Sequence, residues 1–406
     1  MLQKRPLNFP SNRDTSLDHA LVTAALKETL DTVGNLEHYE ADRSFRIVPG
    51  QEKIHPSIAK LVETLRAQPS LNIFNGRMQC LNYGIRWELR DLADWLIRRG
   101  LNVGIAQAAT DLQRYLPVTQ IPFAMVLGLA GLAVEKLYHF GGGIDLLPWK
   151  HLPKSYKKRM EEIVSGASYQ LKWPSAALVR KIMLPKFHIP DREPLPPVRI
   201  DDSELKDAVL FIGVVGPFAP EVLVSWLEPP PWVPTMGGAF SRPILEGLPR
   251  HDVLTDDHFE TASRLFETFR KLSSEKKDIL RLPLQRLSKA MRGSSEVDSL
   301  VDLGIAMEAL FLKDREDDRG ELSFRLRLRI ARYLEQDIEK RKKLFEYIRV
   351  FYKLRSIAVH TGSVSPKEKK SKPTSEILLE GYRLTAEAIR RFITEGIPDW
   401  DKIELQ

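Results

Sequence analysis

The chain has 406 residues, enough for roughly two or three domains with cores of their own. Hydrophobic residues make up 43% and charged residues 28%, while a single cysteine, Cys80, excludes a disulfide framework and a zinc cluster of cysteines and fits a reducing compartment. The net charge of +7 is compatible with a nucleic-acid partner but proves none, because the charge is spread along the chain: from residue 251 onward, 31 Lys/Arg against 28 Asp/Glu leave only +3.

Targeting and membrane signals are weak in this sequence. Residues 1–6, Met-Leu-Gln-Lys-Arg-Pro, lack the apolar core of a signal peptide. The most apolar run, residues 123–134, is too short to span a bilayer and suits a buried strand or helix. We therefore expect a cytoplasmic protein without a membrane partner.

The amino-terminal region, residues 1–118, has the spacing of amphipathic helices. After Pro56, apolar side chains recur at intervals of three and four, which places them on one helix face. The helices predicted here cover residues 17–30, a stretch from residue 56, residues 85–100 ending at Gly100, and residues 101–115. We interpret the region as a helical support layer; a helical surface that grips a ligand is the alternative.

The middle region, residues 119–250, has the pattern of a β-rich mixed domain. The strands predicted here cover residues 123–134, 144–148, 176–183 and 208–215. Gly141–Gly143 is interpreted as a turn that needs positive φ, because no Gly-Lys-Ser/Thr follows it to make a phosphate loop. Five prolines between residues 185 and 197 break regular structure, and residues 229–234, Pro-Pro-Pro-Trp-Val-Pro, predict a stiff linker or a clamp between domains.

The carboxyl-terminal region, residues 251–406, is helical in pattern almost throughout. The helices predicted here cover residues 255–272, 282–291, 296–312, 321–334, 337–355 and 375–393. Thr255 offers a capping hydroxyl to the first of them. We therefore expect an α+β multidomain protein, in which an N-terminal helical segment and a β-rich middle domain precede an all-α helical bundle.

Two side chains near the end of the fifth of these helices form the candidate catalytic site. Arg355 and His360 lie in residues 351–362, Phe-Tyr-Lys-Leu-Arg-Ser-Ile-Ala-Val-His-Thr-Gly. A histidine can move protons near neutral pH, and a forked guanidinium can hold phosphate oxygens. The alternative is that both side chains only cap carbonyl groups at the C-terminus of the helix.

Other charged residues of this region have two readings each. Glu308 lies in an apolar stretch, so its carboxylate needs a partner or faces a site, and we favour a hydrogen-bond anchor over a catalytic role. Arg325, Arg329 and Arg332 stand on one predicted helix, either as RNA-binding residues or as a solvated face paired with acids. His251, Asp256, Asp257 and His258 could also be considered as metal ligands. We favour helix capping as the role of the acids.

Three segments share the order and spacing of a known family. Residues 298–311, Asp-Ser-Leu-Val-Asp-Leu-Gly-Ile-Ala-Met-Glu-Ala-Leu-Phe, end in Ala-x-Glu-x-Leu-Phe. Residues 325–331 read Arg-Leu-Arg-Leu-Arg-Ile-Ala, and residues 355–360 read Arg-Ser-Ile-Ala-Val-His. Together they resemble the central helix, the arginine-rich helix and the Arg-x4-6-His signature of the HEPN superfamily, and within it the Apea-like group. The resemblance covers about residues 256–392.

The resemblance implies a helical bundle that forms a homodimer and cleaves RNA without a metal or other cofactor. Arg355 and His360 would be the catalytic residues, and the products would carry 2′,3′-cyclic phosphate and 5′-OH ends. The amino-terminal two-thirds would sense an unknown signal, and proteins of this build resemble those used in antiviral defence or abortive infection, by analogy only. The rival hypothesis is a non-catalytic module that binds RNA or a nucleotide, or that serves as a dimerisation platform.

Helix geometry limits how Arg355 and His360 can cooperate. Residues five apart on a regular helix point about 140° away from each other, so the two converge only if the helix ends or loosens before His360. Thr361 and Gly362 are a plausible place for that break, and a second chain is the alternative source of the missing group. Tyr352 and Ser356 share the face of His360 and support the site in this reading, although Ser356 replaces the Asn, Asp or His that is commoner in the family.

Overall fold

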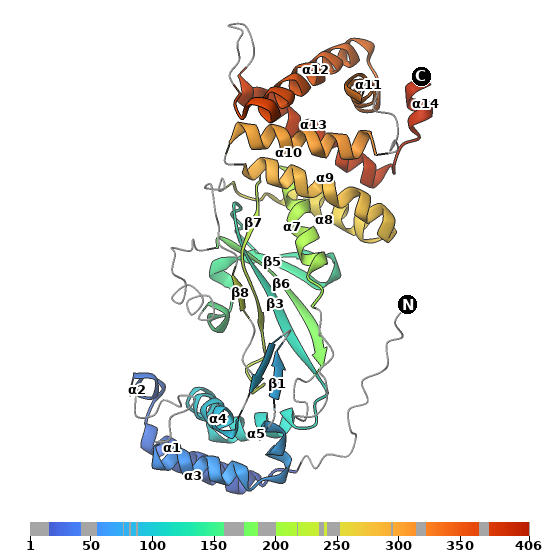
Figure 1. The fold of residues 1–406 in the computed structure, drawn as a ribbon. Coiled ribbons are helices and arrows are strands. Elements are labelled where there is room, and N and C mark those ends of the chain that lie inside the picture. Colours follow the sequence, from blue (N-terminus) through green and yellow to red (C-terminus); the bar gives the residue numbers. More distant parts are fainter. Residues whose placement is uncertain are drawn as a thin grey trace. The chain divides into compact units, whose positions relative to one another are not determined.

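The computed structural model describes residues 16–41, 55–75, 77–80, 83–86, 88–157, 174–185, 200–216, 218–234, 239–241, 252–293, 295–313, 322–364 and 373–405. The chain is an α+β protein, with helices at the amino-terminal end, a sheet in the middle and helices α8–α14 at the carboxyl-terminal end (Figure 1). The predicted fold class is therefore confirmed. Within the described ranges, no helix combines the length and the apolar character that crossing a membrane requires.

The contacts of the chain divide it into two compact units. The first unit comprises Met1–Met125, Lys181–Asp201 and Trp226–Phe240. The second unit comprises Val126–Arg180, Asp202–Ser225 and Ser241–Gln406. Each unit thus collects segments that are distant in the sequence, and the candidate site lies in the second.

The first unit begins with helices that cover the predicted positions. Its elements are α1 (His19–Val33), α2 (Leu36–Ala41), α3 (Pro56–Arg66), η2 (Pro69–Asn75), the paired strands β1 (Arg77–Cys80) and β2 (Tyr83–Arg86), α4 (Leu89–Val103) and α5 (Ile105–Tyr115). The apolar face predicted for α3 is confirmed, because Ile58, Leu61, Val62 and Leu65 are all buried.

The helix predicted over residues 85–100 is displaced in the structure. Tyr83–Arg86 belongs to the β1–β2 hairpin, so α4 starts only at Leu89. Gly100 does not end the helix; it is buried inside α4, where a Cβ would lie 2.8 Å from Cδ1 of Leu30. The glycine therefore serves close packing between α4 and α1, and the chain leaves the helix at Gly104, whose φ is +92°.

The middle of the chain forms a sheet with the strand order β4-β5-β6-β3-β7-β8. Its strands are β3 (Gln120–Ala130), β4 (Tyr138–Phe140), β5 (Ile144–Pro148), β6 (Ala176–Pro185), β7 (Glu221–Glu228) and β8 (Ala239–Ser241). β5 pairs antiparallel with both β4 and β6. Three of the predicted strands are confirmed as β3, β5 and β6. The glycine turn between β4 and β5 has positive φ at Gly142 and Gly143, as expected.

The strand predicted over residues 208–215 is wrong, because this segment belongs to helix α7 (Ser203–Val215). A continuous apolar run looks the same for a buried strand and for a helix that is covered on most sides. α7 is covered in this way, since it packs against α8 (Asp256–Arg270), α9 (Ser274–Arg292) and α13 (Thr374–Thr394). The prolines predicted to break structure between residues 185 and 197 lie almost wholly outside the described residues, whereas β7 was not predicted.

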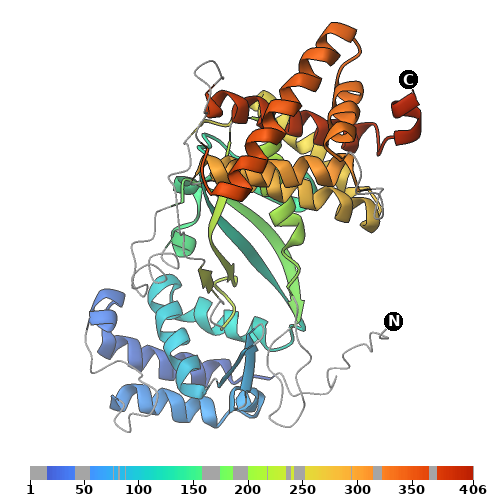
Figure 2. The same cartoon turned by 45° about the horizontal axis from the view of Figure 1, so that its top comes forward.

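The carboxyl-terminal helices agree with the sequence pattern. Besides α8, α9 and α13, they are α10 (Glu296–Phe311), α11 (Leu322–Leu334), α12 (Ile338–Thr361) and α14 (Trp400–Leu405). α10 packs against α9, α12 and α13, and α11 lies beside α12 (Figures 1 and 2). The predicted helices are confirmed in position, although α9 begins earlier than expected and continues through Pro283, and α12 extends beyond its expected end at residue 355.

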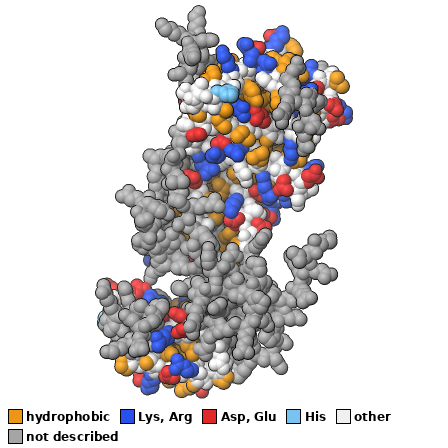
Figure 3. Space-filling model, in the orientation of Figure 1, with side chains coloured by type: hydrophobic (Ala, Val, Ile, Leu, Met, Phe, Trp, Pro, Cys, Tyr) orange, Lys and Arg blue, Asp and Glu red, His pale blue; other side chains and the backbone are white. Residues whose placement is uncertain are grey.

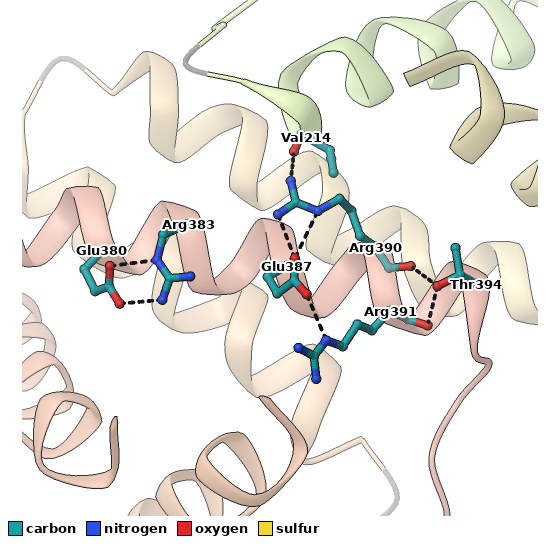
Figure 4. Close-up of polar contacts among 7 residues, drawn as sticks. All are labelled: Val214, Glu380, Arg383, Glu387, Arg390, Arg391 and Thr394. Atoms are coloured by element: carbon teal, nitrogen blue, oxygen red, sulfur yellow. Dashed lines mark hydrogen bonds and ion pairs between the residues drawn. The ribbon is translucent and has the colours of Figure 1, made fainter. Parts of the chain in front are cut away.

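Ion pairs fix α13 along its length (Figure 4). The Glu387 carboxylate accepts hydrogen bonds from Arg390 and Arg391, each at 2.8 Å, and Arg383 pairs with Glu380 at 2.7 Å. Arg390 also donates to the carbonyl oxygen of Val214 at 3.1 Å, which links α13 to the end of α7. The arginine side chains of α13 in this network therefore stabilise the helix and its contact with α7.

Candidate functional site

Helix α12 carries the two predicted catalytic residues and is regular along its whole length. The Asp337 carboxylate caps its start by accepting from the Lys340 backbone N–H at 2.9 Å. The helix ends at Gly362, which has φ +64° and donates its N–H to the carbonyl of Ala358 at 2.9 Å. The expectation that this helix stops at residue 355 is wrong, since His360 is still inside the helix. The left-handed turn that ends α12 is available only at the glycine.

Arg355 points from α12 onto α10. Its guanidinium lies 3.4 Å from Glu308, and its stem lies directly over Gly304, where a Cβ would be 3.0 Å from Cγ of Arg355. The Tyr352 hydroxyl donates a hydrogen bond of 2.6 Å to Glu308, and the guanidinium lies 5.5 Å from the Tyr352 ring centre. The Glu308 carboxylate thus holds two residues of α12 from one position on α10.

The Arg355 site is half-buried, and this burial shapes its electrostatics. The side chains of Arg355 and Glu308 are 23% and 29% exposed. Nε of Arg355 is buried and has no hydrogen-bond partner among the described residues. Burial, followed by the hydrogen bond to Glu308, raises the pKa of Tyr352 to about 12. The phenol is therefore a neutral donor at physiological pH, and the predicted role of Glu308 as a hydrogen-bond anchor agrees with these contacts.

His360 lies on a different side of α12 from Arg355. The imidazole is exposed, and it has no hydrogen bond or ion pair with another described residue. Because α12 stays helical, the five-residue interval turns the two side chains about 140° apart. Ser356 stands one turn before His360 and is half-buried. One chain thus presents a fixed guanidinium and a free imidazole, but it does not bring the two together.

The arginines of α11 hold the end of the chain. Arg329 is fully buried, pairs with Glu404 of α14 at 2.5 Å and donates to the carbonyl of Phe311 at 2.6 Å. Arg332 donates to the carbonyls of Ile403 and Glu404, and Arg325 lies 3.5 Å from the Glu404 carboxylate. Contact with RNA is excluded for Arg329 in this conformation, because its side chain has no exposed surface.

Two of the residues considered as metal ligands, Asp256 and His258, have other partners. Asp256 pairs with Lys136 and accepts a hydrogen bond of 2.9 Å from Tyr138, while Nδ1 of His258 lies 2.8 Å from the Thr255 hydroxyl. His251 lies outside the described residues. In the part of the chain that the structure describes, no three His, Cys, Asp or Glu side chains gather as a metal site.

Gly304 is the site residue that sequence reasoning missed. It stands one helical turn before Glu308, and its missing side chain makes room for Arg355. The signal was present in the sequence as a glycine within an apolar helix, where alanine would be the better helix former. A glycine inside a helix can mark a place where another group approaches closely.

The site must be interpreted from its own geometry. Comparison of the chain with protein-family models, with curated proteins and with solved structures gave no match. The geometry offers a guanidinium fixed by Glu308 and Tyr352, a neutral phenol, and a solvent-facing imidazole near the end of the same helix. These groups can bind phosphate and transfer protons.

Proposed function

We propose that the chain is a metal-independent endoribonuclease of the HEPN type. It cleaves RNA by attack of the 2′-OH on the adjacent phosphate and leaves 2′,3′-cyclic phosphate and 5′-OH ends. The observation that carries the proposal is the presence on α12 of an anchored Arg355 and of an exposed His360 without a partner among the described residues, about 7.5 Å farther along the helix axis. Both are groups that this reaction needs, and both stand near the exposed end of one rigid element.

Each group has a distinct part in the proposed chemistry. His360 exchanges a proton with the reacting oxygens, because its imidazole faces solvent and can accept or donate a proton. Arg355 stabilises the charge that develops on the phosphate oxygens. Glu308 and Tyr352 position Arg355 by fixing its side chain against α10. Because Glu308 offsets part of the guanidinium charge, its role is orientation rather than stronger phosphate binding.

A homodimer completes the site in this proposal. Arg355 and His360 of one straight helix diverge, so they do not act on one phosphate together. A twofold arrangement of the carboxyl-terminal bundles supplies His360 from one copy and Arg355 from the other. The amino-terminal region then restrains or triggers the nuclease, in cytoplasmic antiviral defence or abortive infection.

A non-catalytic RNA- or nucleotide-binding or dimerisation module is the second candidate function. Two observations favour it: Arg355 is already engaged by Glu308, and His360 has no orienting partner among the described residues. A catalytic histidine usually depends on a second group that fixes its ring and its tautomer. In the dimeric nuclease, that partner comes from the second copy.

Cleavage of a mixed RNA substrate in chelator tests the proposal. Wild type produces cyclic phosphate ends, whereas Arg355→Ala and His360→Ala each lose at least about 100-fold in rate, as expected for removal of a proton-transfer or charge-stabilising group. Arg349→Ala is the matched control, because Arg349 is an exposed cation of α12 whose acidic partner within the described ranges is Glu346. Equal cleavage by all four folded proteins would sink the nuclease proposal, and intact RNA that binds in a salt-dependent way would favour the binding module.

A further inference from the structure

A second group of side chains lies where the first half of α11 meets the first third of α12. We name Phe324, Arg327 and Phe345 the aromatic–arginine cluster. The Phe324 and Phe345 rings meet edge to face with their centres 5.8 Å apart. The Arg327 guanidinium lies 4.7 Å from the centre of Phe345 and 5.7 Å from that of Phe324. Phe324 is 46% exposed, so one large aromatic ring of the cluster faces solvent.

Arg327 differs from the other arginines of α11 in its partners. Its Nε donates to the carbonyl of Ser323 at 3.0 Å, and among the described residues it has no carboxylate partner. By contrast, Arg325 and Arg329 both pair with Glu404, and the arginines of α13 pair with acids of their own helix (Figure 4). Arg327 therefore keeps a full positive charge beside two aromatic rings.

The segment that carries this cluster is basic in sequence, although Arg325, Arg329 and Arg355 pair with acids that lie outside it. Residues 322–361, which span α11 and α12, contain 11 Lys/Arg and 4 Asp/Glu, so their net charge is 11 − 4 = +7, equal to that of the whole chain. On the face drawn in Figure 3, Lys and Arg side chains lie among hydrophobic side chains over the carboxyl-terminal helices. Aromatic rings within a basic surface are the combination that binds single-stranded nucleic acid.

The cluster and His360 lie on one side of α12. Tyr352 and Ser356 are within about 20° of Phe345 around the helix axis, and His360 is within about 60°. The axial separation between Phe345 and His360 is about 22 Å. The cluster and His360 are therefore about four helical turns apart on α12, with the contact between Tyr352 and Glu308 of α10 between them.

We propose that the aromatic–arginine cluster is a base-stacking subsite for single-stranded RNA. An unpaired base stacks on the exposed ring of Phe324, and Arg327 contacts the neighbouring phosphate. The strand then continues along α12 toward His360, so the inference rests on the proposed nuclease and names its substrate as RNA with unpaired bases. Duplex RNA is a poorer ligand, because its bases are already stacked on each other.

A second copy of the chain is the less favoured occupant of this surface. A twofold contact through the cluster itself would bring Arg327 of one copy near Arg327 of the other, and like charges that face each other oppose association. RNA, in contrast, supplies both the negative charge that Arg327 lacks and flat apolar rings for Phe324. The composite catalytic site does not need this surface either, since His360 lies at the opposite end of α12.

The test measures RNA binding by the full-length chain with His360→Ala as the background, so that cleavage does not interfere. The probes are a fluorescent single-stranded oligoribonucleotide and an RNA duplex of the same length, followed by anisotropy. Phe324→Ala weakens single-strand binding by about 5- to 150-fold, which corresponds to the contribution of one stacked base. Phe324→Trp restores binding, and Arg327→Gln lowers the slope of log K against log salt by about 0.7. Val350→Ala, an exposed apolar truncation on another side of α12, leaves binding unchanged.

Each other outcome overturns the inference. If Phe324→Ala binds single-stranded RNA as tightly as the His360→Ala background protein, the Phe324 ring does not stack a base. If the background protein binds no RNA at all, the subsite does not exist. Sedimentation of Phe324→Ala distinguishes the rival: a shift toward monomer with unchanged RNA affinity assigns the cluster to self-association. The cleavage assay keeps the two proposals separate. If the wild type cleaves RNA but Phe324→Ala does not weaken binding, only the subsite is refuted. If Phe324→Ala weakens binding but the wild type does not cleave RNA, only the nuclease is refuted.

Discussion

Replacing Gly304 with alanine tests whether the position of Arg355 matters for activity. The added methyl group would lie 3.0 Å from Cγ and 3.1 Å from Nε of Arg355. Carbon atoms prefer separations of about 3.5–4.0 Å, so the arginine stem must move by roughly 0.5–1 Å. A displacement of about 1 Å can cost about 100-fold in rate when a group must meet the reacting atoms in a fixed geometry.

The same substitution has opposing effects on stability. Alanine in place of glycine in a helix interior stabilises by about 0.5–1 kcal/mol, whereas overpacking costs about 1–3 kcal/mol. Arg355 is 23% exposed, so its side chain can move outward and relieve most of the overlap. We therefore expect the free energy of unfolding to change by no more than about 1 kcal/mol, from the difference of these two effects.

Single-turnover RNA cleavage and urea unfolding separate the two effects. Gly304→Ala should lose between about 10- and 100-fold in cleavage rate while it remains folded. Gly381→Ala is the control for overpacking, since its Cβ would lie 3.1 Å from Leu303 of α10 and 3.3 Å from Tyr347 of α12, and Arg355 is not among its nearest neighbours. Wild-type cleavage by Gly304→Ala would refute the reasoning, and so would an equal loss of cleavage in the two variants.

Two further predictions concern stability. Burial and the hydrogen bond to Glu308 raise the pKa of Tyr352 to about 12, while tyrosine in the unfolded chain ionises near pH 10. The stabilisation by this phenol is therefore complete below about pH 10 and is lost as the pH rises from 10 through 12. The melting temperature of Tyr352→Phe should fall less than that of wild type over this pH range. An equal fall in the two proteins would contradict the assigned cause. Arg329→Ala removes one partner of a buried ion pair and should lower the free energy of unfolding, measured by urea titration, by about 3 kcal/mol. A decrease of less than about 1 kcal/mol would contradict this prediction.

The local pattern was sufficient to predict most helices of the carboxyl-terminal region. Caps and three- and four-residue spacing locate α8, α10 and α13 to within a few residues, because these signals are local properties of the chain. The same reasoning failed at residues 208–215. An apolar run does not record whether the neighbours that cover it are helices or strands, and only tertiary packing made this segment α7.

For the candidate site too, some features could be predicted from the sequence and others only from the tertiary structure. The sequence by itself determined that Arg355 lies near the end of a charged helix, that His360 follows five residues later, and that Glu308 needs a partner. Residue type, spacing and the cost of burying a carboxylate can all be assessed from the sequence alone. Only the tertiary structure decided that the helix continues to Gly362, that Arg355 lies against Gly304 and Glu308, and that Arg329 is buried while Arg327 is not paired with an acid among the described residues. The physical reason is that the direction and the partners of a long charged side chain depend on the elements that pack beside it, and these come from distant parts of the chain.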